Sequence, residues 1–255
     1  MLEIEIFKVF LLVMVRLSGL MISAPVLASR NIPIIAKIGL TALTAMLVTP
    51  MVPALEQTLP DAAVPFAALA VGELIIGVLI GFVMTLLFAA VQVAGQIIDL
   101  QTGFGMMNVF NPAMETQFPI FGFFLFIIAV LYLLIFGGHR LMIWALCSTY
   151  QSIPVGGFVA RPELLLQMSG WGQTMFLNGL MIAAPVAAAM LLAYVTMGLL
   201  GRVVPQIHLF VVGFPVTIAT GLFITALVVG VYVRVLDGMF QQMFRNVATL
   251  IRGLG

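Results

Sequence analysis

The sequence predicts an all-α protein built from long apolar helices that belong to a membrane. Hydrophobic residues make up 63% of the 255 positions and charged residues only 7%, whereas an ordinary soluble domain is about 25% charged. The few charges are also separated by long uncharged intervals, and about 20 apolar residues suffice for a helix to cross a bilayer. The formal net charge of +1 offers no basic surface for nucleic acid. These observations exclude a water-soluble globule and a nucleic-acid-binding protein.

The uncharged intervals mark the candidate membrane spans in chain order. They cover residues 38–55, 74–98, 116–139, 164–201 and 203–233. We expect the first three to hold one span each. The last two are expected to form a hairpin of helices over roughly residues 174–200 and 209–233, with its tip at 201–208. Pro185 predicts a kink or break in the first helix of this hairpin.

Several polar residues lie at depths where lipid contact is costly. Arg16 is in the middle of the first apolar segment, 7–27, where an arginine costs about 2.5–3.5 kcal/mol on insertion scales. Glu73, Asp99 and Arg234 raise the same problem, so we expect these residues to be paired or hydrogen-bonded inside the chain or at its interfaces. The full set of expected buried polar or interface residues is Arg16, Glu73, Asp99, Arg202, Gln206 and Arg234.

Small residues recur along one of the expected helices. Gly72, Gly77 and Gly81 follow one another, and the last two form a GxxxG pair that allows a second backbone to approach closely. Packing within a single bundle accounts for any one of these glycines. Together with the charges at awkward depths, however, they favour a subunit whose helix faces meet protein in a larger assembly.

The sequence contains none of the common catalytic motifs. There is no GxxxxGK[ST] phosphate loop, no GxGxxG fingerprint and no HExxH zinc pair. Cys147 is the only cysteine, so it cannot form an internal disulfide. Ser169 with His139 or His208 is the nearest approach to a serine nucleophile and its base, but we expect this serine in a polar loop with a structural role. We therefore expect a protein that is not an enzyme, with no cofactor and no metal.

The stretch 101–119, QTGFGMMNVFNPAMETQFP, is the most informative segment. Its glycines and prolines prevent one regular helix, yet it is rich in methionine and phenylalanine. Irregular backbone is tolerated at membrane depth only where protein buries it or where it lines a cavity. Two interpretations are equally consistent with the residues: a flexible plug that closes a lumen, or a loop that packs against its own helices. The candidate plug residues are Gly103, Phe104, Gly105, Met106, Met107, Phe110, Pro112 and Met114.

Basic residues give no consistent topology. The turns near Arg30 and Arg202 would be cytoplasmic by the positive-inside tendency. The C-terminal tail with Arg245 and Arg252 would also prefer the cytoplasm, although it lies one span beyond the Arg202 turn. Either one segment does not span, or the protein does not sit in the bilayer as a simple bundle.

Several motifs together resemble the FliR family of flagellar export-gate subunits, which includes the corresponding subunits of virulence type III secretion systems. The resemblance runs nearly end to end, and the PQ and GFP pair in the last motif is its most specific part. The motifs are RLSGLMISAPVLASRNIP (16–33), VGELIIGVLIGF (71–82), the 101–119 stretch, IFGGHR (135–140), IPVG (153–156) and GRVVPQIHLFVVGFPVTIATG (201–221).

The resemblance implies a structural and gating subunit of a protein-export channel. It implies assembly with about five copies of FliP and about four of FliQ, contact with FlhB and membrane lipid, and passage of unfolded flagellar proteins. Residues 1–172 would be FliP-like and residues 173–255 FliQ-like, with 101–119 as the plug. The complex would belong to the bacterial inner membrane and the flagellar basal body, with much of it above the membrane plane.

A secondary transporter for a small solute is the alternative function. Broken helices around Pro185 and Pro205 would then form a site at the middle of the membrane. That fold predicts an inverted repeat of the two halves, and the sequence contains no convincing one.

Overall fold

The computed structural model describes residues 2–53, 59–105, 119–159, 162–204 and 209–254. These residues are 88% helical and include no strand, which confirms the all-α fold class. Among them, five helices are long and apolar enough to cross a membrane, and a further bent pair of helices could add a sixth span.

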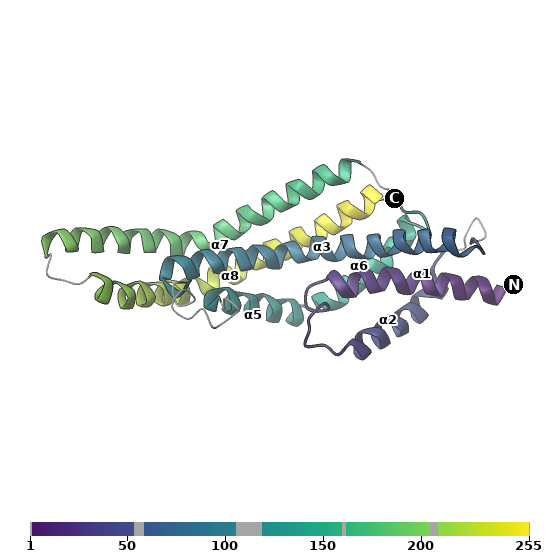
Figure 1. Cartoon of the computed structure of the whole chain (residues 1–255), viewed down its shortest axis with the longest axis horizontal. Helices are drawn as coiled ribbons and strands as arrows, with labels where there is room; N and C mark the ends of the chain where they lie inside the picture. The colour runs from purple at the N-terminus through teal and green to yellow at the C-terminus, as the bar shows by residue number, and fades with distance from the viewer. Residues whose placement is uncertain (1, 54–58, 106–118, 160–161, 205–208, 255) are drawn as a thin grey trace. The chain divides into compact units, whose positions relative to one another are not determined.

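Figure 1 shows the helices of the described residues. They are α1 (Leu2–Ser23), α2 (Ile34–Val48), the short 3₁₀ turn η1 (Thr49–Met51), α3 (Ala63–Thr102), α5 (Ile120–Ile135), α6 (Gly138–Ser152), α7 (Pro162–Val203) and α8 (Leu209–Leu254). The expected hairpin helices are present, but both are longer than expected. The C-terminal tail is not a separate segment, because α8 continues through it.

The structure adds detail to three local expectations. Residues 116–139 do not form one continuous helix, because α5 ends at Ile135 and Gly137 adopts a left-handed φ of 67° before α6 begins; α5 and α6 together could still form one bent span. Pro185 lies inside α7, so the expected break is absent, and a kink there stays a prediction. Its neighbours Ala183 and Val186 are buried. Ser169 lies within α7 rather than in a loop, and its hydroxyl donates to the Leu166 carbonyl.

The chain divides into two compact units that are discontinuous in sequence. Unit 1 contains residues 1–86, 133–172 and 241–255, and unit 2 contains residues 87–132 and 173–240. Each unit combines residues from both sides of the expected division at 172/173. That division concerns likeness to two other proteins rather than packing, so it stays a prediction.

In unit 1, α1 packs directly against the first half of α3 through glycines. A Cβ added at Gly19 would lie 2.6 Å from the Leu74 carbonyl oxygen, and one added at Gly77 would lie 3.0 Å from the Gly19 Cα. Further along the same contact, the Thr85 hydroxyl of α3 donates to the Ser23 carbonyl of α1 at 2.7 Å. The glycine pattern is thus confirmed as a close-approach surface, and its use is packing within the chain.

A polar cluster in unit 1 fastens the start of α1 to the segment that precedes α3. The Lys8 ammonium donates to Asp61 Oδ1 at 2.6 Å, to Glu5 Oε1 at 3.0 Å and to the Leu59 carbonyl at 3.3 Å. The hydrogen bond from Lys8, reinforced by its positive charge, lowers the pKa of Asp61 below its usual value of 3.8. Asp61 is fully exposed, so its contribution to stability is modest.

In unit 2, α5 contacts both the second half of α3 and α8, and these two helices also contact each other. Aromatic rings connect these helices: Phe88 makes edge contacts with Phe126 at 5.7 Å and with Phe240 at 6.1 Å between ring centroids. The Tyr232 hydroxyl donates to the Leu125 carbonyl at 2.9 Å. Unit 2 is therefore held in part by large aromatic side chains, and the polar end of Tyr232 has a backbone partner.

We expect Gly77→Ala to destabilise the protein by about 1–3 kcal/mol, because the added methyl group meets backbone atoms of α1 that cannot move aside easily. Gly39→Ala is the matched control. Gly39 is inside α2 with open space around it, so its replacement should be neutral or stabilise by about 0.5–1 kcal/mol. Thermal unfolding of both variants in detergent tests this, and equal melting temperatures would contradict the close packing of α1 on α3.

A pH series tests the Lys8 and Asp61 contact. Because folding lowers the pKa of Asp61, its stabilising contribution is complete above 3.8 and disappears as the pH falls through the lower, folded value. We expect Asp61→Asn to lower the melting temperature slightly at pH 7 and to have no effect well below pH 3.8. A difference that persists unchanged in strong acid would show that the charge is not its cause.

Candidate functional site

Three charged residues are buried, two in unit 1 and one in unit 2. Arg16 and Glu73 are completely buried in unit 1, and Asp99 is 4% exposed in unit 2. A buried charge is tolerated only when partners replace the water that it has lost. We therefore follow the partners of each group in turn.

The Arg16 guanidinium, on α1, has an acceptor for each of its five N–H groups. Its Nε and Nη2 donate to the two carboxylate oxygens of Glu73 on α3, at 2.5 and 3.1 Å. Its Nη1 donates to the Thr149 hydroxyl at 2.8 Å and to the Ile153 carbonyl at 3.2 Å, and Nη2 donates to the Pro154 carbonyl at 3.5 Å. The result is a bidentate ion pair with no donor left over.

The end of α6 completes this cluster. The carbonyls of Ile153 and Pro154 lie at the negative end of the α6 dipole, where a guanidinium is favoured. The Gly156 N–H donates to Glu73 Oε1 at 2.7 Å, and the Tyr150 ring lies 4.1 Å from the Arg16 guanidinium carbon. The cluster therefore joins α1, α3 and α6, and its geometry is that of a structural fastening.

Asp99, on α3, binds the beginning of α5. Its two carboxylate oxygens accept the backbone N–H groups of Phe121 and Gly122, at 3.1 and 3.2 Å. The first N–H groups of a helix have no partner within the helix and favour a negative charge. Asp99 thus caps α5 from a different helix. The close contact of α3 with α5 at this point depends on Gly95 and Gly122, because a Cβ at Gly95 would collide with the backbone of Gly122.

The last carbonyls of α3 are satisfied by α7 and α8. The Tyr194 hydroxyl of α7 donates to the Gln101 carbonyl at 2.5 Å, and the Thr217 hydroxyl of α8 donates to the Thr102 carbonyl at 3.0 Å. The α8 backbone comes close at Gly221, where a Cβ would meet the Thr102 side chain. The end of α3 is consequently fixed to both long helices within unit 2.

The described part of the candidate plug begins at this fixed point. Gly103, directly after the end of α3, has a φ of +89°, a conformation that suits glycine. It lies beside the Phe214 ring. The Phe104 ring makes an edge contact with Phe121 of α5, at 5.7 Å between centroids. Gly105 is half-buried. The remaining candidates, Met106, Met107, Phe110, Pro112 and Met114, lie outside the described residues.

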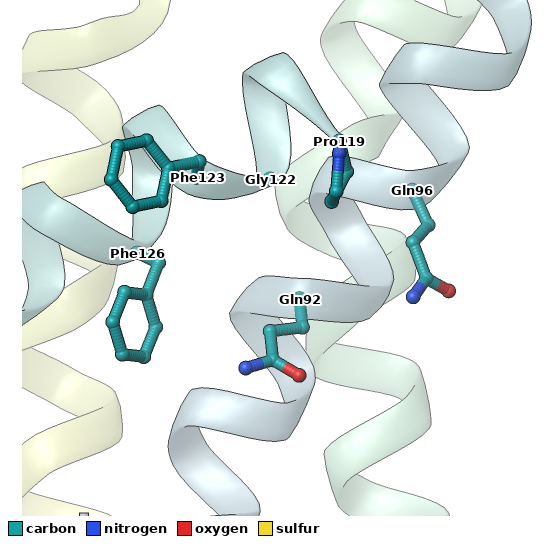
Figure 2. A pocket seen from close by; sticks show the side chains of 6 residues that line it. All are labelled: Gln92, Gln96, Pro119, Gly122, Phe123 and Phe126. Atoms are coloured by element: carbon teal, nitrogen blue, oxygen red, sulfur yellow. The ribbon is translucent and has the colours of Figure 1, made fainter. Parts of the chain in front are cut away.

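A pocket of 320 Å³ lies beside the start of α5 (Figure 2). Gln92 and Gln96 line it from α3, while Phe123 and Phe126 line it from α5. Pro119 and Gly122 complete the lining, so the pocket borders the residues that Asp99 holds. The described residues contain no group of three or more His, Cys, Asp and Glu side chains that could hold a metal ion.

The other three expected interface residues are not part of these buried clusters. Arg202, at the end of α7, and Arg234, on α8, are both exposed in the chain, and Gln206 lies outside the described residues. Their roles at interfaces stay predictions. Sequence reasoning missed Gly95, Gly122 and Thr217, because each is a single small residue with no spacing pattern around it.

Comparison with known proteins decides the family. The model of the family described as bacterial export proteins, family 1, matches residues 7–243. The chain belongs to this family. Its relatives include the flagellar biosynthetic protein FliR of Escherichia coli K12, which is 32% identical over 94% of this chain and 92% of the relative. The FliR of Bacillus subtilis 168 is 30% identical over 97% of both chains, and that of Pectobacterium carotovorum is 33% identical over 94% and 91%.

The resemblance to FliR seen in the sequence is confirmed. The chain is therefore a membrane protein of the flagellar export system, and its buried polar clusters hold helices together.

We expect Arg16→Met to destabilise the protein by about 3–5 kcal/mol, because it leaves the Glu73 carboxylate buried without its partner. The double variant Arg16→Met with Glu73→Leu removes both charges and should recover much of the loss. Chemical unfolding of the single and double variants forms a double-mutant cycle. If the double variant were as unstable as the sum of the two single ones, the pair would not be coupled as described.

Proposed function

We propose that this chain is a structural and gating subunit of the flagellar type III export gate. It would form the export pore with about five copies of FliP and about four of FliQ, in contact with FlhB, and unfolded flagellar proteins would pass through it. The match to the export family over residues 7–243 is the observation that carries this proposal.

The distribution of apolar surface supports a role as a subunit. In the most apolar window of α3, 56% of the residues are buried, whereas the figure is 17% for the helix that begins at Ile34 and 22% for both α7 and α8. The three poorly buried helices therefore present apolar faces that lipid or another protein must cover. The α7 and α8 faces would receive FliQ, in keeping with a FliQ-like part from residue 173 and a FliP-like part before it.

The 101–119 loop would be the plug of the pore. Its methionines and phenylalanines would form an apolar seal through many weak dispersion contacts, which exclude water and ions without bonding the pore shut. The fixed end of α3 and the capped start of α5 support this role, because a plug needs firm ends to hold its position. The assembled gate would belong to the inner membrane and the flagellar basal body.

Mass measurement tests the assembly. The chain is produced alone and together with FliP and FliQ, and each product is purified and weighed by native mass spectrometry. We expect the chain alone to be unstable or aggregated and to be recovered in a complex when FliP is present. A stable, monodisperse monomer that takes up a small solute would instead support a secondary transporter.

A second experiment tests the plug. Replacing Met106, Met107 and Met114 with alanine should leave assembly intact and raise the conductance of the purified complex in planar bilayers. The same replacement in a loop that only packs against its own helices should reduce assembly before any leak appears. A complex that stays tight after the loop is shortened would refute the plug.

A further inference from the structure

The face of α8 that carries Arg234 is apolar and exposed. Phe223 and Leu227 are both 63% exposed, and Gly230, Arg234 and Gly238 are exposed as well. Spacings of three or four residues place all five on one side of the helix. Within the part of the chain that the structure describes, the Arg234 guanidinium has no hydrogen bond and no ion pair. A permanent charge therefore lies without a partner on a surface that lipid or protein must cover.

Asp237, the nearest carboxylate along α8, does not neutralise this arginine. Its Oδ1 accepts the Tyr132 hydroxyl at 2.7 Å, and none of the ion pairs among the described residues joins it to Arg234. An arginine in apolar surroundings is costly unless an acceptor faces it. The missing acceptor must therefore come from whatever covers this face.

Glycines flank Arg234 by one turn on either side. A Cβ added at Gly230 or Gly238 would meet nothing within 4 Å, so packing among the described residues does not require glycine there. Gly221, also on α8, differs, because a Cβ there would meet the Thr102 side chain. Glycine inside a helix is less favourable than alanine. At an interface, however, it lets a second backbone come close.

Unit 1 contains a completed contact of the same kind. Arg16 pairs with the Glu73 carboxylate where Gly19 and Gly77 bring α1 and α3 together. The arginine is three residues from the glycine on its own helix, and the carboxylate is four residues from the glycine on the other. The exposed face of α8 has the arginine and the glycines but lacks the helix that carries the carboxylate.

We propose that this face binds an apolar helix of a partner subunit, and that an aspartate or glutamate of that helix pairs with Arg234. The open glycines let the helix approach until the carboxylate accepts two N–H groups of the guanidinium. A lipid chain has no acceptor to offer, and a headgroup phosphate needs no glycine beside it. The identity of the partner rests on the proposed function, in which α8 faces neighbouring subunits of the export complex.

The experiment measures the yield and native mass of the complete complex of this chain with FliP and FliQ. Arg234→Leu removes the charge and keeps the face apolar. Arg245→Leu is the matched control, because Arg245 is an exposed arginine on the same helix whose neighbours one turn away, Gln241 and Thr249, are polar. We expect Arg234→Leu to lower the yield about tenfold or more, since the partner's carboxylate loses its cation. The control should assemble like the parent.

An exchange of charges identifies the partner residue and guards against a variant that simply fails to fold. Arg234→Glu is combined in turn with arginine in place of each aspartate or glutamate in the apolar helices of FliP and FliQ. We expect one combination to restore an assembly that neither single change supports. If no combination restores it, or if Arg234→Leu assembles like the parent, the inference is wrong.

The same measurements distinguish other occupants of the face. A second copy of this chain in the native mass, lost with Arg234→Leu, would overturn the inference, and so would an intact complex that loses only bound phospholipid. If the parent assembles and only the Arg234 results fail, the proposed function stands without this contact. If the parent itself does not assemble with FliP and FliQ, the proposed function and this inference both fail.

Discussion

Unit 1 depends on the burial of one arginine. Once Arg16 is placed inside an apolar helix, the fold must supply five acceptors or leave a charge without water. Glu73 supplies two of them, and the end of α6 supplies the other three through Thr149 and two backbone carbonyls. Three helices are thereby brought together at one point, and the glycines that let α1 and α3 touch make this distance possible.

The sequence predicted the class of fold and most of the helices because apolar length is a strong signal. It predicted the ends of the helices poorly. Gly137 ends an apolar stretch that composition alone makes continuous, since a left-handed residue leaves no trace in hydropathy. At Pro185 composition suggested an interruption, yet α7 continues through this residue. One missing hydrogen bond can be tolerated in a long helix that packs against its neighbours.

The sequence identified the polar residues of the site but could not pair them. Arg16, Glu73 and Asp99 are conspicuous because each is a charge in an apolar run. The apolar helix face around each charge is buried, and the charge is buried with it. Their partners are a carboxylate 57 positions away and backbone N–H groups of another helix. Backbone donors have no side-chain signature, so the capping of α5 appears only when α3 and α5 are seen side by side. The plug as a whole stays a prediction, and residues 106–118 lie outside the described residues.

The two clusters solve the problem of a buried charge in different ways, and the difference bears on motion. Arg16 and Glu73 neutralise each other, so opening their contact would expose two charges at once and is strongly opposed. Asp99 has no cation among its hydrogen-bond partners in the described residues: it is satisfied by two backbone N–H groups at the start of one helix. Opening the first contact therefore costs more than opening the second, which depends on the placement of one helix end.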